Sequence, residues 1–312
     1  MMLGRNSSSC EMSAMIPLRV ACIGRGGQTA QALAAVAAGY PSIALTQAGR
    51  ETADLTDAAA LEAFIHQSQP HVVINAGAYN LVDKAESDEA TAFAVNAEGP
   101  RTLARLCRQN SVHFIHMSTD CVFDGTLTGA YTEDNKPNPI SAYGRSKLAG
   151  EQAVAQEYPE ATTARVCWVF SEYADNFVSK VIGFAQSRPA LQIVNDQFGP
   201  PTYAPDIAIA LVRLARTKVE GVKHVPHLLH VAAPETMSRS DMAVKIMAES
   251  QRQGGSFAQI TPVATATFNA PAKRPANAHL SGARATQLLG LDWTPFDVAL
   301  EKSVTGILRR AS

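Results

Sequence analysis

From Leu18 onward, short apolar runs alternate with longer segments whose apolar residues recur at helical spacing. The apolar runs are candidate strands and cover residues 18–24, 42–48, 71–77, 112–118 and 163–169. Segments 29–39, 58–68 and 88–110 are rich in alanine and place their apolar residues where a helix would pack on a sheet. Strands that alternate with helices indicate βαβ units. We therefore predict an α/β fold with a doubly wound parallel sheet.

The first predicted strand ends in a glycine-rich turn that leads into a predicted helix. Gly24 and Gly27 are three residues apart, and Gln28 follows them directly. Such a turn lets backbone N–H groups approach a pyrophosphate, and the helix N-terminus then faces the anion. A tight turn that needs positive φ is the alternative explanation for these glycines. Their position after the first strand favours a dinucleotide site and hence a Rossmann-type sheet.

The tip of the second predicted strand indicates which dinucleotide is bound. It carries no acid of the kind that binds the ribose 2′-hydroxyl of NAD, whereas Arg50 suits a 2′-phosphate. Because Glu51 is adjacent, an ordinary solvated arginine is the alternative. We predict NADPH as the cofactor, with NADH as the alternative.

The alternation loosens after Trp168, where prolines break the chain into loops. We predict a dinucleotide-binding domain over residues 18–168, with residues 206–232 returning to it. Residues 169–205 and 233–312 then form a smaller C-terminal substrate-binding lobe. Residues 1–17 lack the long apolar run of a secretory signal, and we predict that they form a disordered leader, with a natural start further downstream as the alternative.

Composition excludes several classes of protein. A net charge of −1 without a basic stripe argues against nucleic acid as a partner, and no apolar run is long enough to span a bilayer. Three histidines in residues 224–230 suggest a metal, but strand alternation and an intervening proline keep them from converging, so we predict no metal site. The cysteines are odd in number and unclustered, which favours a reducing cytoplasm. They are Cys10, Cys22, Cys107, Cys121 and Cys167.

A tyrosine and a lysine, Tyr143 and Lys147, lie four residues apart near the start of a predicted helix. They therefore share one helix face. Either both side chains are simply exposed to solvent, or the lysine lowers the pKa of the phenol from about 10 toward about 7. Ser118, Thr119 and Asp120 follow a predicted strand, where a hydroxyl can bind a substrate carbonyl. Alone, these three residues are more typical of a cap or turn.

Together these motifs resemble the extended short-chain dehydrogenase/reductases, and more closely their dTDP-4-dehydrorhamnose reductase family. The resemblance covers nearly all of the chain from Leu18 and is carried by AGAYNLVDKAESDEATAFAVN, STDCVFDG, SAYGRSKLAGE, NDQFGPPT and KRPANAHLS. It implies NAD(P)H-dependent reduction of the C4 keto group of a nucleotide-linked 6-deoxy-4-keto sugar. Family habit suggests a homodimer.

The resemblance also implies roles for individual residues. Gly24, Gly27 and Gln28 would contact the pyrophosphate, Asp54 and Leu55 would lie near the adenine, and Ala76, Gly77 and Ala78 would lie along the cofactor. Thr119 would orient the C4 carbonyl, Tyr143 would donate the proton, and Lys147 would hold the nicotinamide ribose. Substrate contacts would come from Asp120, Cys121, Trp168 against the nucleotide base, Asn195 and Gln197 in a closing loop, and Arg274 at the diphosphate.

The chain departs from the family pattern at Cys121, where a tyrosine is usual, which removes an aromatic wall and its hydroxyl. As a nucleophile Cys121 lacks a histidine base placed by sequence, so a small packing residue is favoured. Two other function classes stay open. One is an epimerase or dehydratase of the same superfamily, although Cys121 stands where such dehydratases carry a glutamic acid. The other is a non-catalytic NADP-binding regulatory subunit.

Overall fold

The computed structural model describes residues 17–221 and 224–311. The predicted leader lies outside the described residues, apart from Pro17. Among the described residues, no helix has both the length and the apolar character needed to cross a bilayer.

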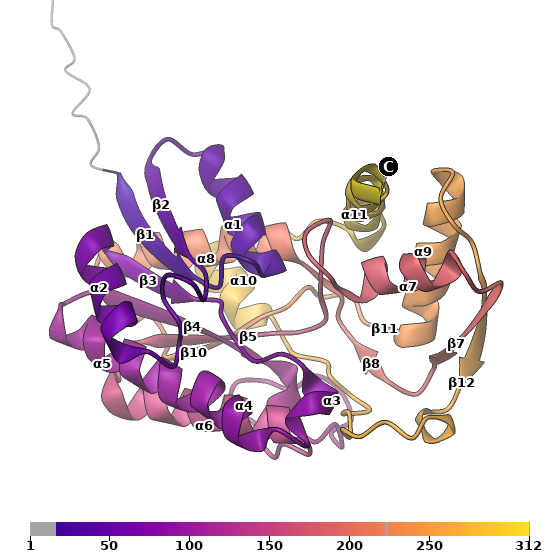
Figure 1. Ribbon diagram of the computed structural model, residues 1–312, viewed down its shortest axis with the longest axis horizontal. Coiled ribbons are helices and arrows are strands. Elements are labelled where there is room, and N and C mark those ends of the chain that lie inside the picture. Colours follow the sequence, from indigo (N-terminus) through magenta and orange to yellow (C-terminus); the bar gives the residue numbers. More distant parts are fainter. Residues whose placement is uncertain (1–16, 222–223, 312) are drawn as a thin grey trace, which may run out of the picture.

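A six-stranded parallel sheet forms the centre of the larger body, with strand order β10-β5-β4-β3-β1-β2 (Figure 1). Its strands are β1 (Leu18–Ile23), β2 (Ile43–Ala48), β3 (Val72–Asn75), β4 (His113–Thr119), β5 (Thr162–Val166) and β10 (Leu228–Val231). The chain leaves β1 for β2 and then returns to β3 on the other side of β1. The carboxyl ends of β1 and β3 therefore flank the crevice in which such sheets bind ligands. The predicted doubly wound sheet is confirmed.

Helices cover both faces of this sheet, and each face has its own apolar cluster. Helices α1 (Gln28–Ala38) and α8 (Ala204–Val219) pack on one face. Helices α2 (Ala58–Ser68), α5 (Gly99–Gln109) and α6 (Ala142–Glu157) pack on the other. Both clusters consist mainly of alanine, valine, leucine and isoleucine, which explains the alanine-rich helical segments of the sequence.

The predicted helical segment 88–110 contains a π-helical turn. Residues Ala94–Glu98 (η1) connect α4 (Glu89–Phe93) to α5. The buried Asn96 of this turn bonds the backbone of Tyr79 in both directions, and it donates to the hydroxyl of Ser146 on α6 at 3.0 Å. The π turn thus fastens the segment after β3 to the helix that carries Tyr143 and Lys147.

The predicted strand 163–169 is interrupted at Trp168, which has a left-handed backbone with φ of 42°. Strand β5 ends at Val166, and the short strand β6 (Val169–Phe170) pairs instead with β9 (Thr202–Tyr203). The backbone N–H of Thr202 donates to the carbonyl oxygen of Trp168. The chain therefore turns out of the central sheet at Trp168 and enters the second body.

The second body has a separate apolar core formed largely by α7 (Phe177–Ala185), α9 (Arg239–Arg252) and α11 (Phe296–Ala311). Strands β7 (Ala190–Val194) and β12 (Gln259–Val263) pair in parallel at its edge, as Figure 1 shows. Strands β8 (Phe198–Gly199) and β11 (Met237–Ser238) form a further short pair. The remaining short elements are α3 (Val82–Ala85), η2 (Asp120–Val122) and η3 (Thr265–Thr267).

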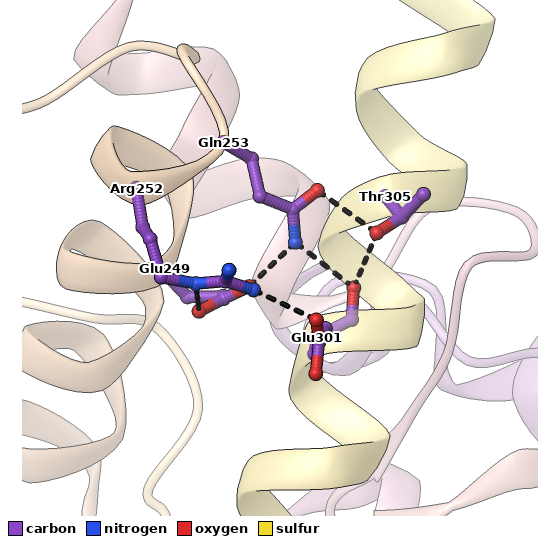
Figure 2. A network of polar contacts seen from close by, with 5 residues as sticks. All are labelled: Glu249, Arg252, Gln253, Glu301 and Thr305. Carbon is purple, nitrogen blue, oxygen red and sulfur yellow. Dashed lines mark hydrogen bonds and ion pairs between the residues drawn. The ribbon is translucent and has the colours of Figure 1, made fainter.

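Polar side chains at the end of α9 bind α11 at the surface of the second body, as Figure 2 shows. Arg252 donates to Glu249 and, at 2.8 Å, to Glu301. Gln253 donates to the backbone carbonyl of Glu301, and Thr305 donates to the Gln253 side chain. Because exposed ion pairs contribute only about 0–1 kcal/mol, the apolar core stabilises this helix pair more than the network does.

Helix α10 (Ala283–Leu289) packs on the central sheet body, although the predicted boundary at residue 233 places it in the substrate-binding lobe. Ala285 and Leu289 are buried in the same cluster as α8 and β10. Segment 206–232, which was expected to return to the first domain, supplies most of α8 and all of β10. The apolar face of α10 therefore extends the first body beyond the expected range.

Candidate active site

The ends of β1, β2 and β3 form a first cleft of about 480 Å³. Gly24 has a φ of 104°, and a Cβ at this position would lie 2.6 Å from the backbone nitrogen of Gly77. The alternative explanation of a turn that needs positive φ therefore holds for Gly24, and the close approach of Gly77 also leaves no room for a side chain, whereas contact of this turn with a pyrophosphate stays a prediction. Most of the predicted cofactor residues line this cleft: Gly24, Gly27, Arg50, Asp54, Leu55, Ala76, Gly77 and Ala78.

Gln28 lies between the two bodies of the molecule. Its side-chain amide donates to the carbonyl oxygen of Val169 at 3.0 Å and accepts from the hydroxyl of Ser171 at 3.0 Å. Gln28 lines the second cleft rather than the first. These bonds tie the start of α1 to the second body, and a contact between Gln28 and the pyrophosphate stays a prediction.

Charged residues gather at the mouth of the first cleft. Arg50 is 79% exposed, and its Nε lies 3.7 Å from Oδ2 of Asp54. Arg25, in the glycine turn, pairs with Glu51 at 2.7 Å. Arg25 was not among the predicted site residues, although a cation within a phosphate-binding turn is a signal that could have identified it. Two arginines therefore face a cleft that suits a phosphorylated ribose, and the contact of Arg50 with a 2′-phosphate stays a prediction.

A second cleft of about 420 Å³ begins at the end of β4, where Thr119 and Tyr143 both line it. Helix α6 starts against this strand end. Its cap residue Ser141 accepts from the backbone of Gly144, and a Cβ on Gly144 would lie 2.2 Å from the carbonyl oxygen of Cys121. This close approach of α6 to the β4 end brings Tyr143 to Thr119. The hydroxyl of Thr119 donates to Asp120 at 2.9 Å.

Lys147 lies one helical turn beyond Tyr143 and is 2% exposed. Its ammonium donates to the carbonyl oxygen of Met117 at 2.7 Å. Burial lowers the pKa of Lys147 to about 8, and the carboxylate of Glu151 acts in the opposite direction. The lysine is thus held beside the end of β4 and can titrate near neutral pH, but it is not among the described residues that line either cleft, and its contact with the nicotinamide ribose stays a prediction.

The pKa of Tyr143 differs from the expectation that Lys147 lowers it. Burial raises the pKa of Tyr143 well above its ordinary value, and the charges of Cys121 and Asp120 add to this effect. The physical reason is that removing the phenolate from water costs more than the hydrogen bond with Thr119, which lowers the pKa, returns. The phenol is therefore protonated at neutral pH, which is the state that a proton donor requires.

Asp120 and Cys121 both line the second cleft. Burial raises the pKa of Asp120, which is 7% exposed. Burial also raises the pKa of the Cys121 thiol, so the thiolate that a nucleophile needs is not formed at neutral pH. The packing interpretation of Cys121 therefore agrees with its surroundings.

Trp168 lines the second cleft, but its ring is already in close contact with protein atoms. The guanidinium carbon of Arg239 lies 3.4 Å from the centre of the ring. A Cβ on Gly199 would lie 2.8 Å from another ring atom, so the backbone at Gly199 packs directly on the indole. Stacking of a nucleotide base on Trp168 stays a prediction.

Arg239 is a cleft residue that was not predicted from the sequence, because its position at the start of α9 gives no local signal of which cavity it faces.

The remaining predicted substrate residues differ in position. Arg274 and Gln197 line the second cleft, whereas Asn195 is not among the described residues that line either cleft. Arg274 is paired with Asp83 at 2.7 Å, and Gln197 donates to the hydroxyl of Thr265. The backbone N–H of Asn195 instead donates to the carbonyl of Val263, which continues the β7 and β12 pairing. Among the described residues, no group of three or more histidine, cysteine or acidic side chains is arranged to hold a metal ion.

A dinucleotide cleft beside a threonine, a partly buried tyrosine and a buried lysine defines the class of this protein as an extended short-chain dehydrogenase/reductase. The family model described as RmlD substrate binding domain matches residues 18–308. The chain therefore belongs to this family, and the predicted dTDP-4-dehydrorhamnose reductase resemblance is confirmed.

Two named relatives and one solved structure illustrate the similarity. The dTDP-4-dehydrorhamnose reductase of Mycobacterium tuberculosis strain H37Rv is 40% identical over 280 residues, which is 88% of each chain. The enzyme of that name from Sinorhizobium fredii is 34% identical and covers 93% of this chain and 98% of its own. The dTDP-4-dehydrorhamnose reductase of Bacillus anthracis, solved in complex with NADP, is 27% identical with a TM-score of 0.83. That comparison covers 94% of this chain and 99% of the other.

Proposed function

We propose that this protein reduces the C4 keto group of a dTDP-linked 6-deoxy-4-keto sugar with NADPH. The observation that carries the proposal is the junction of the two clefts, where Thr119 and Tyr143 stand at the end of β4 beside the dinucleotide crevice. The names of the relatives supply the substrate class, because dTDP-4-dehydrorhamnose reductases recur among them.

The residues of the first cleft fit a dinucleotide cofactor. The side-chain-free surface at Gly24 and Gly77 would accept the pyrophosphate, and the start of α1 would face its charge. Arg50 would contact the 2′-phosphate, with Asp54 and Leu55 at the adenine. NADPH, when bound, supplies the hydride that C4 receives. NADH is the alternative that the exposed position of Arg50 leaves open.

The residues of the second cleft would handle the proton. Tyr143 donates its phenolic proton to the C4 oxygen as that oxygen becomes an alkoxide, and Thr119 hydrogen-bonds the same oxygen. Lys147, which lies behind the cleft wall and is not among the described residues that line either cleft, would hold the nicotinamide ribose, and its positive charge would stabilise the phenolate left behind. Solvent then returns the proton to Tyr143. Asp120, Cys121, Trp168, Gln197 and Arg274 would contact the substrate from the walls of the cleft.

The test is an incubation of purified protein with NADPH and dTDP-4-dehydrorhamnose. We expect loss of the absorbance of the reduced nicotinamide, in a one-to-one ratio with a dTDP-deoxysugar product. Binding of NADPH without reduction of any sugar in a panel of nucleotide-linked keto sugars would support a regulatory subunit instead. Sugar conversion without net loss of NADPH would support an epimerase or dehydratase.

We also propose a homodimer located in the cytoplasm. The four cysteines in the described part of the chain are free, which is compatible with a reducing compartment. Light scattering after size-exclusion chromatography tests the oligomeric state, and the mass of a single chain would contradict the dimer.

A further inference from the structure

Arg239 reaches the second cleft from the second body of the molecule. It is the first residue of α9, and its backbone N–H donates to the carbonyl oxygen of Gln197 at 3.1 Å. Arg239 and Gln197 both line the cleft. Gln197, which also lines the cleft, therefore holds the backbone of Arg239 in place.

The guanidinium of Arg239 lies on an aromatic platform made by two segments. Its central carbon is 3.4 Å from the ring centre of Trp168 and 4.9 Å from that of Phe177. Contacts of this kind strengthen when the cation is removed from water, and they fix a planar guanidinium in one orientation. The guanidinium of Arg239 therefore covers a face of the Trp168 ring that was expected to be free for a nucleotide base.

Arg239 forms no ion pair within the described part of the chain, although the carboxyl group of Asp120 in the same cleft acts on its charge. Arg274, in the same cleft, is paired with Asp83, and the buried Arg165 is paired with Glu151. By contrast, none of the ion pairs or side-chain hydrogen bonds of the described residues involves the guanidinium of Arg239. Burial lowers the pKa of Arg239 to about 10, so the group stays charged at neutral pH. The N–H groups of this partly buried guanidinium are therefore open to a ligand in the cleft that accepts hydrogen bonds.

We propose that Arg239 is a phosphate-binding residue of this cleft, which acts on the diphosphate of the nucleotide substrate, and that Trp168 serves as the platform for its guanidinium. This inference rests on the proposed function, because the nucleotide sugar supplies the diphosphate. With Arg274 at the same cleft, two guanidinium groups face a ligand that carries two phosphate groups. Trp168 then affects affinity through the orientation of Arg239 and not by stacking on the base.

The test measures binding of dTDP, dTMP and thymidine by calorimetry to the NADP-loaded protein. Arg239→Gln should weaken dTDP binding by about tenfold or more and leave thymidine binding unchanged, since charge-assisted hydrogen bonds to phosphate are lost. Arg239→Lys should retain part of the dTDP affinity because it keeps the charge. Trp168→Leu should reproduce the selective loss of dTDP affinity.

Arg188→Gln is the matched control. Its guanidinium carbon also lies over an aromatic ring, 5.2 Å from the centre of the exposed Phe184, but neither residue lines the second cleft. This variant should bind all three ligands as the unmodified protein does.

Three outcomes separate this inference from the proposed function. If the unmodified protein binds dTDP and Arg239→Gln binds it equally well, the inference is wrong and the reductase proposal stands. If thymidine binding falls as much as dTDP binding in Arg239→Gln, the arginine only shapes the cleft and the inference is also wrong. If the unmodified protein binds none of the three ligands, both the nucleotide-sugar proposal and the inference are contradicted.

Discussion

Replacing Tyr143 by phenylalanine removes one hydroxyl group from the second cleft and keeps the shape of the side chain. Because burial raises the pKa of Tyr143, the unmodified phenol carries its proton throughout the neutral range. A positioned proton donor contributes about 10²–10⁴ to turnover. The variant should therefore lose that factor, which corresponds to about 2.7–5.4 kcal/mol of activation free energy.

Cofactor binding and folding should change little in the same variant. The ring of Tyr143 packs against the apolar cluster under α6, and phenylalanine preserves this packing. The assay combines steady-state reduction of the keto sugar, fluorescence titration with NADPH and thermal unfolding. Tyr203→Phe is the control, because its hydroxyl donates to Glu172 at 2.9 Å away from both clefts and should not affect turnover. Turnover of Tyr143→Phe close to that of the unmodified protein would refute Tyr143 as the proton donor.

Three further changes test other parts of the account. Lys147 is charged below its pKa of about 8 and neutral above it, so NADPH affinity should fall as the pH rises through that value. In Lys147→Met the affinity for NADPH should be lower and independent of pH. If NADPH titrations give the same pH profile for this variant and the unmodified protein, the role of the lysine is contradicted. Arg50→Ala should weaken NADPH binding about tenfold or more and spare NADH, and equal losses for both cofactors would remove Arg50 from the 2′-phosphate. Glu151→Gln removes the carboxylate that pairs with Arg165, which is 2% exposed. Because this leaves a buried charge unpaired, the free energy of unfolding measured by urea titration should fall by about 3–5 kcal/mol. An unchanged urea midpoint would show that Arg165 is stabilised without Glu151.

The sheet and its helices could be predicted because their signals are local. Apolar runs of strand length and alanine-rich helical spacing gave β1, α1, β2 and α2 within about two residues, and the glycine turn gave the position of the first cleft. The π turn at residues 94–98 was not predictable in this way. It depends on Asn96 bonding to Tyr79 and Ser146, which only the folded chain brings together.

Site residues that belong to a sequence motif could be predicted, whereas residues that reach the site only through tertiary packing could not. Thr119 and Tyr143 come together because α6 starts against the end of β4, as the family resemblance implied. The raised pKa of Tyr143 was not foreseen, because burial depends on residues distant in sequence. Arg239 was missed for the same reason, since it lies 71 positions after Trp168 in the printed sequence and meets it only through the packing of α9.

The most direct test of the central claim follows the hydride itself. Protein is incubated with dTDP-4-dehydrorhamnose and NADPH that carries deuterium at nicotinamide C4 in the transferred position. Mass spectrometry and proton NMR then locate the label in the sugar product. The account predicts one deuterium at sugar C4 for each NADPH oxidised. Product without deuterium at C4, or NADPH that is not consumed while the sugar is converted, would contradict reduction of the C4 keto group.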